Sequence, residues 1–242
     1  MPEQVDDAIL LRLLDLQKED SSIRRLAERR ASLPEAQELV ELRDQLAELD
    51  SDIAIARKQS EEIATEQARI EGEIGLLDTK IQREEQRMYS GGVSNPKELS
   101  ALQAEVESLK RKKGQMEDGL LEVMVQKDDA ATTLTRLESE QAESLAREKE
   151  LAVVVDGLTA DIDAQLVEHT ARRSQIAQEM PADLLALYDQ LRESKHGVGA
   201  AALQSGACQG CHTQLPAKEV ERLKTERGLQ RCDNCRRILV VL

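Results

Sequence analysis

The sequence is nearly free of aromatic residues. Its 242 residues include no Trp, no Phe and only two Tyr, whereas 33% of the side chains are charged. A thick globular core is therefore excluded. The apolar content comes from Leu, Ile, Val and Ala, and such side chains can be buried in thin seams between helices. This composition predicts a mainly α-helical protein built from extended helices.

The sequence also lacks a long hydrophobic run. No stretch approaches the roughly 20 apolar residues that a membrane-spanning helix needs. The first seven residues, MPEQVDD, are acidic and do not form a basic leader. We therefore expect a cytoplasmic protein with no membrane partner. In that reducing compartment, four cysteines in two close pairs are more typical of metal ligands than of disulfides.

The formal net charge of −14 is unevenly distributed along the chain. Residues 196–242 contain seven basic and four acidic side chains, so the first 195 residues carry −17. An acidic region repels phosphate backbones and a basic one attracts them, which suggests two parts with different partners. Four thiolates around Zn²⁺ would reduce the excess positive charge of the tail to about +1.

Apolar residues repeat every three or four positions from residue 39 to residue 88, which predicts a coiled-coil helix of roughly 75 Å. Polar residues occupy three positions of the same repeat, at Ser60, Gln67 and Glu84. The apolar positions are Leu39, Leu42, Leu46, Leu49, Ile53, Ala56, Ile63, Ile70, Ile74, Leu77, Ile81 and Met88.

The repeat is interrupted at Gly91 and Gly92, and a helix-start signal follows. Asn95 is suited to the N-cap, Pro96 to the first helical position and Glu98 to the third, so that Asn and Glu would satisfy backbone donors as a capping box. We predict a hairpin tip at residues 89–97.

The heptad repeat resumes at Leu99 and continues to Leu137, with Lys113 and Lys127 at two seam positions. Folding the chain back at the tip pairs positions whose numbers sum to 186 or 187. Ile53 would then face Leu134, and the polar residues Ser60 and Lys127 would coincide. An antiparallel hairpin within one chain explains this alignment.

The remaining helices are predicted at residues 5–33 and 181–195. Pro34 should start or kink the helix that follows the first of these. The second bears Leu184, Leu187, Tyr188 and Leu191 and should dock the tail against the base of the stalk. We assign residues 1–195 to a coiled-coil stalk domain and residues 196–242 to a zinc-ribbon domain. The ribbon should contain short strands at 198–203 and 238–242 and a short helix at 216–224.

The strongest chemical motif is a set of four cysteines, Cys208, Cys211, Cys232 and Cys235. Each Cys-x-x-Cys pair places two sulfurs on one tight turn, and the 20 residues between the pairs let the two turns meet. We predict one structural Zn²⁺. An iron–sulfur cluster and a redox dithiol are the alternatives. Four protein ligands leave no position for an activated water, so we expect His212 to lie outside the ligand set and no small-molecule substrate to be bound.

Three segments carry a family resemblance: the tip YSGGVSNPKEL, the knuckle CQGCH followed by Leu215 and Pro216, and the knuckle CDNCRRIL. With these motifs, nearly the whole chain resembles the bacterial coiled-coil hairpin proteins that carry a C-terminal four-cysteine (C4-type) zinc ribbon. The resemblance implies a helical stalk, the four cysteines as metal ligands, no known enzymatic activity and a regulatory or adaptor role. Some relatives are linked to flagellar or secretion-gene control through RNA or an alternative sigma factor.

Two functions follow from the sequence. The first is that of a non-enzymatic adaptor or regulatory protein, which uses the coiled-coil stalk and the zinc ribbon to bind a protein partner of unknown identity. Tyr89 and Val93 are the contact candidates at the tip, because neither the turn nor the cap requires them. The second is RNA or DNA binding by the ribbon, although the tail lacks aromatic residues for base stacking. No nucleophile–base pair is recognisable, so we do not expect an enzyme. The candidate phosphate contacts are Lys218, Arg222, Lys224, Arg227, Arg231, Arg236 and Arg237.

Overall fold

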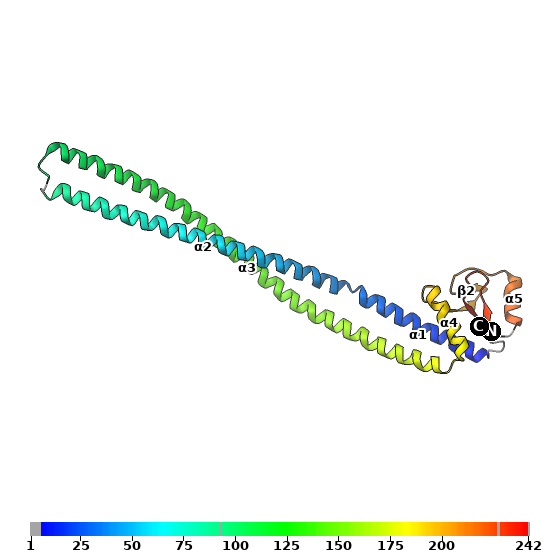
Figure 1. Ribbon diagram of the computed structural model, residues 1–242. Coiled ribbons are helices and arrows are strands. Elements are labelled where there is room, and N and C mark those ends of the chain that lie inside the picture. The colour runs from blue at the N-terminus through cyan, green and yellow to red at the C-terminus, as the bar shows by residue number, and fades with distance from the viewer. Residues whose placement is uncertain (1–5, 92, 227, 242) are drawn as a thin grey trace. The chain divides into compact units, whose positions relative to one another are not determined.

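The computed structural model describes residues 6–91, 93–226 and 228–241, which form a mainly helical chain with a small C-terminal sheet, as predicted (Figure 1). None of the described helices is long and apolar enough to cross a membrane. The helices are α1 (Asp7–Ala31), α2 (Pro34–Tyr89), α3 (Pro96–Gln178), α4 (Ala182–Ser194) and α5 (Ala217–Thr225). The strands are β1 (Ala200–Gln204), β2 (Ala207–Cys208), β3 (Gln230–Arg231) and β4 (Ile238–Val241).

The chain divides into two compact units, which we describe separately. One unit comprises Met1–Glu38 and Leu151–Leu242, and the other comprises Leu39–Glu150. The first contains α1, the C-terminal part of α3, α4 and the ribbon. The second contains most of α2, the turn at the tip and the N-terminal part of α3.

Both predicted helix-start signals are confirmed. Pro34 is the first residue of α2. Asn95 caps α3, because its Oδ1 accepts a hydrogen bond from the Lys97 N–H at 3.0 Å. The predicted return bond from Glu98 is not present among the described residues. Gly91 has a φ of +76°, which favours glycine, and Gly92 lies outside the described residues.

In the second unit, α2 and α3 pack in antiparallel orientation along the predicted seam. Ile53, Ala56 and Leu137 form a buried cluster, against which Leu49 and Leu134 pack, so the predicted neighbours Ile53 and Leu134 belong to one cluster. The sequence predicts Lys127 opposite Ser60. In the structure its ammonium group donates to the side chain of Gln67, another polar residue of the seam, at 2.9 Å from Oε1.

Two charged residues at seam positions, Glu84 and Lys113, form ion pairs. Glu84 is only 4% exposed, and its carboxylate accepts hydrogen bonds from Arg83 at 3.0 Å and Arg87 at 2.7 Å. Burial raises the pKa of Glu84, but these bonds outweigh burial and hold the pKa below its ordinary value. Lys113 lies 2.6 Å from Asp78 on the facing helix. The seam therefore tolerates charge where both partners are present.

In the first unit, α4 joins the ribbon to the base of the helices, as predicted. Leu184 and Tyr188 are fully buried and belong to one core with Leu13 and Leu16 of α1. The predicted helix over 5–33 is observed as α1, with Val5 outside the described residues. The sheet supplies Ala200, Ile238 and Val240 to the same core.

The ribbon sheet has the strand order β2-β1-β4-β3. β1 and β4 pair in parallel, whereas the two outer pairs are antiparallel. The sequence predicted β1 and β4 but not the two-residue strands β2 and β3. One face of the sheet packs on the helices, and the other carries Ala201, Leu203 and Leu239 into a second core with the cysteines.

Candidate metal centre

The four cysteines lie on two loops with the same backbone geometry. Cys208 ends β2, and Cys232 follows β3. In the first loop the His212 N–H donates to the Cys208 carbonyl at 2.7 Å, and in the second the Arg236 N–H donates to the Cys232 carbonyl at 2.8 Å. His212 and Arg236 both have positive φ, 57° and 65°, which closes each turn. Each loop therefore presents its two sulfurs on one side.

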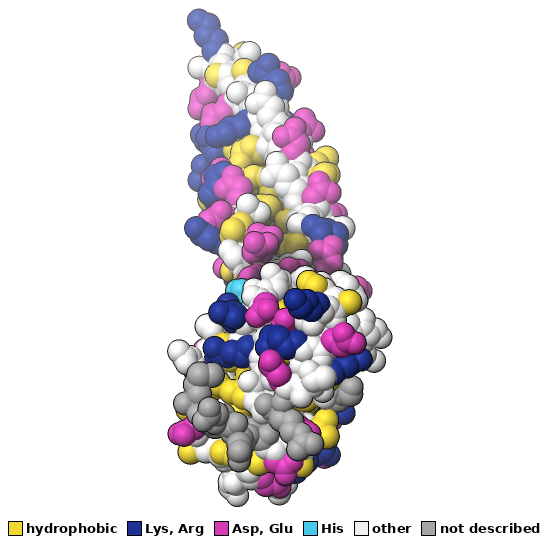
Figure 2. Space-filling model, turned by 90° about the vertical axis from the view of Figure 1, so that its right-hand side faces the viewer, with side chains coloured by type: hydrophobic (Ala, Val, Ile, Leu, Met, Phe, Trp, Pro, Cys, Tyr) yellow, Lys and Arg dark blue, Asp and Glu magenta, His cyan; other side chains and the backbone are white. Residues whose placement is uncertain are grey.

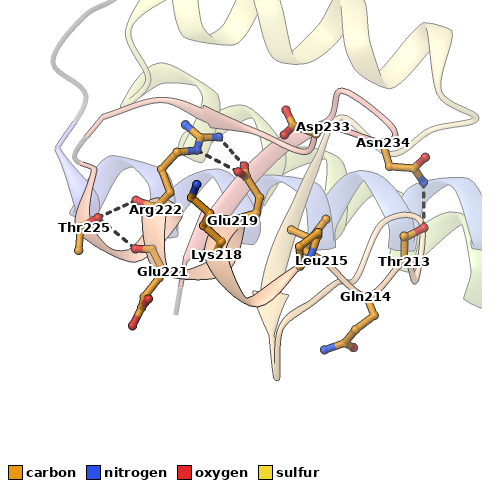
Figure 3. A pocket seen from close by; sticks show the side chains of 11 residues that line it. Thr213, Gln214, Leu215, Lys218, Glu219, Glu221, Arg222, Thr225, Asp233 and Asn234 are labelled. Carbon is orange, nitrogen blue, oxygen red and sulfur yellow. Dashed lines mark hydrogen bonds and ion pairs between the residues drawn. The ribbon is translucent and has the colours of Figure 1, made fainter.

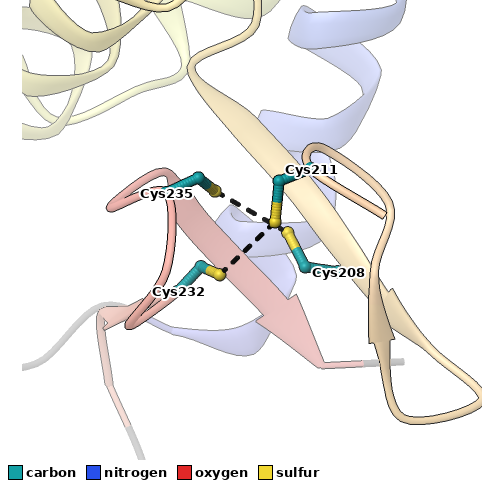
Figure 4. Close-up of side chains that lie close together, drawn as sticks. All are labelled: Cys208, Cys211, Cys232 and Cys235. Atoms are coloured by element: carbon teal, nitrogen blue, oxygen red, sulfur yellow. Dashed lines mark hydrogen bonds between the residues drawn. The ribbon is translucent and has the colours of Figure 1, made fainter. Parts of the chain in front are cut away.

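The four sulfur atoms converge on one point. All lie within 4.8 Å of one another, and the Sγ atoms of Cys208 and Cys235 are 3.9 Å apart, as are those of Cys211 and Cys232 (Figure 4). A tetrahedral zinc with Zn–S bonds of about 2.3 Å has sulfur–sulfur edges of about 3.8 Å. A disulfide needs about 2.05 Å. The cysteines are free, and their spacing fits one tetrahedral Zn²⁺.

The electrostatic environment of the thiols differs from one loop position to the other. Burial raises the pKa of the Cys208 thiol to about 12 and also raises that of Cys232. Burial acts in the same direction on Cys211, but hydrogen bonds from Thr213 and Asn234 outweigh it and lower the pKa to about 6. Zinc binds thiolates, so the metal would supply the positive charge that lets the buried thiols of Cys208 and Cys232 ionise.

A metal in this site would have a closed coordination sphere. Four cysteine ligands complete the tetrahedron that zinc adopts at structural sites, which leaves no position for a water or a substrate. Cys208 and Cys232 are fully buried, whereas Cys211 and Cys235 are half-buried. His212 is exposed and does not belong to the cluster. The chemistry available here is that of a structural centre.

A glutamine that the sequence analysis missed anchors the ribbon to the helices. The side chain of Gln17 on α1 accepts hydrogen bonds from the Gly199 N–H at 2.7 Å and the Ala200 N–H at 3.2 Å, and donates to the Gly197 carbonyl at 3.0 Å. Gly199 is required here, because a Cβ would lie 2.6 Å from the Tyr188 carbonyl oxygen. In the sequence, the signal for this anchor was a polar residue, Gln17, next to the apolar face of α1.

A buried ionic network lies beside this anchor. The Tyr188 hydroxyl donates to Asp20 Oδ2 at 2.7 Å, and Arg173 on α3 lies 3.4 Å from Asp20 and 2.8 Å from Asp189. Burial and the bond to Asp20 raise the pKa of Tyr188. The network joins α1, α3 and α4, so it fixes the surface on which the ribbon rests.

The predicted basic residues of the ribbon do not share one environment. Arg222 is paired with Glu219 and Glu226, and Arg236 lies 3.6 Å from Asp233. Arg237 is part-buried and donates to the carbonyls of Val198 and Lys195, each at 2.9 Å. In the face shown in Figure 2, positive and negative side chains are interspersed.

Three of the other predicted basic positions are described. Lys218 and Lys224 are exposed and have no ion pair among the described residues. Arg231 is half-buried, and its buried Nε has no hydrogen-bond partner in the described part of the chain. Arg227 lies outside the described residues. At the tip, Tyr89 is 82% exposed and Val93 is half-buried.

An open groove of about 890 Å³ lies on the ribbon beside the cysteine cluster (Figure 3). One wall is a face of α5. The other walls come from the segment that precedes α5 and from the second knuckle, where Asn234 donates to Thr213 Oγ1 at 2.8 Å and to Cys211 Sγ at 3.7 Å. The lining residues are Thr213, Gln214, Leu215, Pro216, Lys218, Glu219, Glu221, Arg222, Thr225, Asp233 and Asn234.

Comparison with known families agrees with this architecture. Residues 16–196 match the CT398-like coiled coil hairpin domain. The chain belongs to the CT398-like coiled-coil hairpin family. Residues 207–239 match the C4-type zinc ribbon domain, which spans all four cysteines. Zinc, the metal that the spacing of the four sulfurs fits, is thus also the metal for which this second family is named.

The matches to individual relatives extend over nearly the full length of this chain. A protein of Mycobacterium tuberculosis, named only as uncharacterized, is 28% identical over 233 residues, which covers 95% of this chain and 94% of the relative. A solved structure from Mycobacterium smegmatis has a TM-score of 0.83 at 25% identity and covers 98% of this chain and 99% of that one. The structure of CT398 from Chlamydia trachomatis has a TM-score of 0.70 at 18% identity, over 97% and 98% of the two chains, and so shares the fold.

Proposed function

We propose that this protein is a non-enzymatic adaptor, in which one structural Zn²⁺ shapes a ribbon that binds a protein partner. The observation that carries the proposal is the groove beside the cysteine cluster. Two of its lining residues, Thr213 and Asn234, also hydrogen-bond around Cys211, so the metal site and the groove share a wall. A metal that fixes the knuckles also fixes the groove.

The helices support this proposal by holding the ribbon in place. Gln17 bonds to the ribbon backbone, and α4 packs into the same core as the sheet. A small domain without aromatic residues has little core of its own, so docking onto the helices and zinc ligation together provide its rigidity. Rigidity lowers the entropy cost of binding a partner.

Nucleic-acid binding is the alternative proposal, and the placement of the basic residues favours it less. Arg222 and Arg236 face carboxylates, and Arg237 is used within the ribbon. Lys218 and Lys224 are available to a phosphate, but two lysines supply little of the sequence-independent affinity that such binding needs.

The adaptor proposal can be tested by crosslinking the tagged full-length protein in its native cells, identifying the crosslinked proteins, and reconstituting binding with the purified partner. We expect one protein to bind directly, and Cys232→Ser to abolish its binding by disrupting the ribbon. Ser94→Ala, at an exposed tip position, is the matched control and should bind normally. A partner that binds equally well to Cys232→Ser would contradict a role for the ribbon.

The alternative is tested by measuring binding of RNA and DNA to the same purified protein at several salt concentrations. Phosphate contacts release counterions, so nucleic-acid affinity should fall steeply as salt rises. The adaptor proposal predicts no such binding at low salt. Strong, salt-dependent binding that Lys218→Glu and Lys224→Glu both reduce would favour the alternative.

A further inference from the structure

The packing of the hairpin is interrupted in its middle. No residue from 57 to 80 of α2 or from 107 to 136 of α3 is buried, and all of these residues are described. We call these two ranges together the middle segment. Seam residues on either side of it, such as Ile53 and Ile81, are buried. Within it, the apolar seam residues are only half-buried: Ile63, Ile70, Ile74, Leu77, Leu109, Met116, Leu120, Val123, Ala130 and Leu134.

Polar contacts join the two helices in this segment. Lys113 lies 2.6 Å from Asp78, and the Lys127 ammonium donates to Gln67 Oε1 at 2.9 Å. Polar residues at seam positions fix the register of a coiled coil but lower its stability. Exposed ion pairs and hydrogen bonds also contribute little, because water can replace either partner. The middle of the hairpin is therefore held less firmly than the parts beside it.

An open groove of about 330 Å³ lies along the seam in this segment. Ile63 of α2 and Val123 of α3 both line it, so these apolar side chains are not enclosed by the facing helix. Helices with few buried apolar contacts open locally at a low free-energy cost. The lining residues are Gln59, Glu62, Ile63, Glu66, Val123 and Gln126.

The middle segment also contains four of the five glycines inside α2 and α3. Glycine is the weakest helix former after proline, because it loses the most backbone freedom on folding. A Cβ at any of the four would meet no atom within 4 Å, so no contact within the described chain requires a glycine. Both helices are thus weakest where their packing is weakest. The four glycines are Gly72, Gly75, Gly114 and Gly119.

We propose that the middle segment is a flexible joint, at which α2 and α3 separate and bend locally while the buried residues on either side stay packed. Low burial, polar seam contacts and helix-weakening glycines coincide in this one part of the hairpin. Such a joint lets the tip adjust its position when a partner contacts it, without unpacking Ile53 or Ile81. The joint is a property of the hairpin alone and does not depend on the adaptor function proposed above.

The first test is amide hydrogen exchange of the zinc-loaded full-length protein, followed by mass spectrometry. Protection factors in residues 61–77 and 109–127 should be at least tenfold lower than in residues 42–56, and protection should rise again in residues 81–85. Fraying from the tip would instead give protection that falls steadily towards Tyr89. Uniform protection, or a steady fall without a minimum in the middle, would overturn the joint.

The second test strengthens the helices without new contacts. A variant that combines Gly72→Ala, Gly75→Ala, Gly114→Ala and Gly119→Ala should raise the protection factors of the middle segment at least tenfold, because alanine favours the helix and its Cβ meets open space. Gly157→Ala is the matched control. Gly157 is also inside α3 with no atom near its Cβ, but it lies outside the segment, so protection there should not change.

Pulsed EPR distances across the seam measure the separation of the helices directly. Spin labels on noncanonical amino acids, which leave the cysteines intact, are placed at Ala68 and Asp118 in the segment and at Ala47 and Ser139 beside it. All four positions are exposed. We expect a broader distance distribution for the pair in the segment, which narrows about twofold in the four-alanine variant and keeps its width in Gly157→Ala. Equal widths for the two pairs, or equal effects of the two variants, would overturn the proposal.

Discussion

At the residue scale, the four cysteines and one tyrosine decide how the ribbon is held. The cysteines were evident from their spacing, because two Cys-x-x-Cys pairs have few other uses in a chain of this composition. Tyr188 was visible only as one apolar position of a short helix. Its hydroxyl bonds to Asp20 at 2.7 Å inside the core, which no local pattern reveals.

Tyr188→Phe should destabilise the first unit by about 1–2 kcal/mol, because the buried Asp20 carboxylate loses a hydrogen-bond donor. Arg173 and Arg192 remain near Asp20, so the loss should not be larger. Urea unfolding followed by circular dichroism measures the change. Tyr89→Phe is the control, because Tyr89 is 82% exposed and should show no effect. Equal stabilities for the two variants would contradict a role for the Asp20 bond.

At the element scale, the long helices were predictable and the small strands were not. Heptad spacing extends over dozens of residues in α2 and α3, so the signal accumulates, and the start signals at Pro34 and Asn95 locate the helix ends. β2 and β3 have two residues each, too few for any alternation to show. Their pairing depends on the knuckles, and the parallel pairing of β1 with β4 depends on the docking of both onto α1 and α4.

The cap of α3 provides a test at this scale. Asn95→Ala should lower the stability of the second unit by about 1 kcal/mol, because the Lys97 N–H loses its acceptor. Thermal or urea unfolding of this variant is compared with that of Ser94→Ala, which removes an exposed hydroxyl from the same turn. An equal loss of stability in both variants would mean that any substitution in the turn is destabilising, and that the hydrogen bond of the cap has no special role.

The buried Glu84 predicts a pH dependence of the hairpin. Its native pKa lies below the ordinary value of 4.5, so the carboxylate stabilises the folded state above that pH. Its contribution should disappear as the pH falls from about 4.5 through the native pKa. Urea unfolding of the native protein and of Glu84→Gln at a series of pH values tests this. The stability difference between them should shrink on acidification, and a difference that stays constant across this range would contradict the assignment.

At the scale of the whole molecule, the sequence predicted the fold class and the four cysteines that the structure brings together, but not how the ribbon is attached to the helices. The mounting depends on Gln17 and on contacts between segments more than 150 residues apart, such as Gln17 with Gly199. Single-sequence patterns report local periodicity and cannot register such pairs. Arg237 shows the same limit, because its charge suggested a phosphate contact whereas its guanidinium bonds to two backbone carbonyls.

Removal of zinc should affect the two faces of the sheet differently. One face shares a core with α1 and α4, and the other packs around the cysteines. After chelation, amide hydrogen exchange should accelerate in the knuckles and α5, while α1 and α4 retain protection through Leu13, Leu16 and Leu184. Knuckles that stay protected without metal would show that zinc does not hold the ribbon.

The most direct test of a closed structural zinc centre is X-ray absorption at the zinc edge, combined with the metal content of protein purified without chelators. We predict one zinc per chain with four sulfur neighbours at about 2.3 Å, and no zinc in Cys208→Ser and Cys232→Ser. A site with a nitrogen or oxygen neighbour, or a native protein that carries no zinc, would contradict the account.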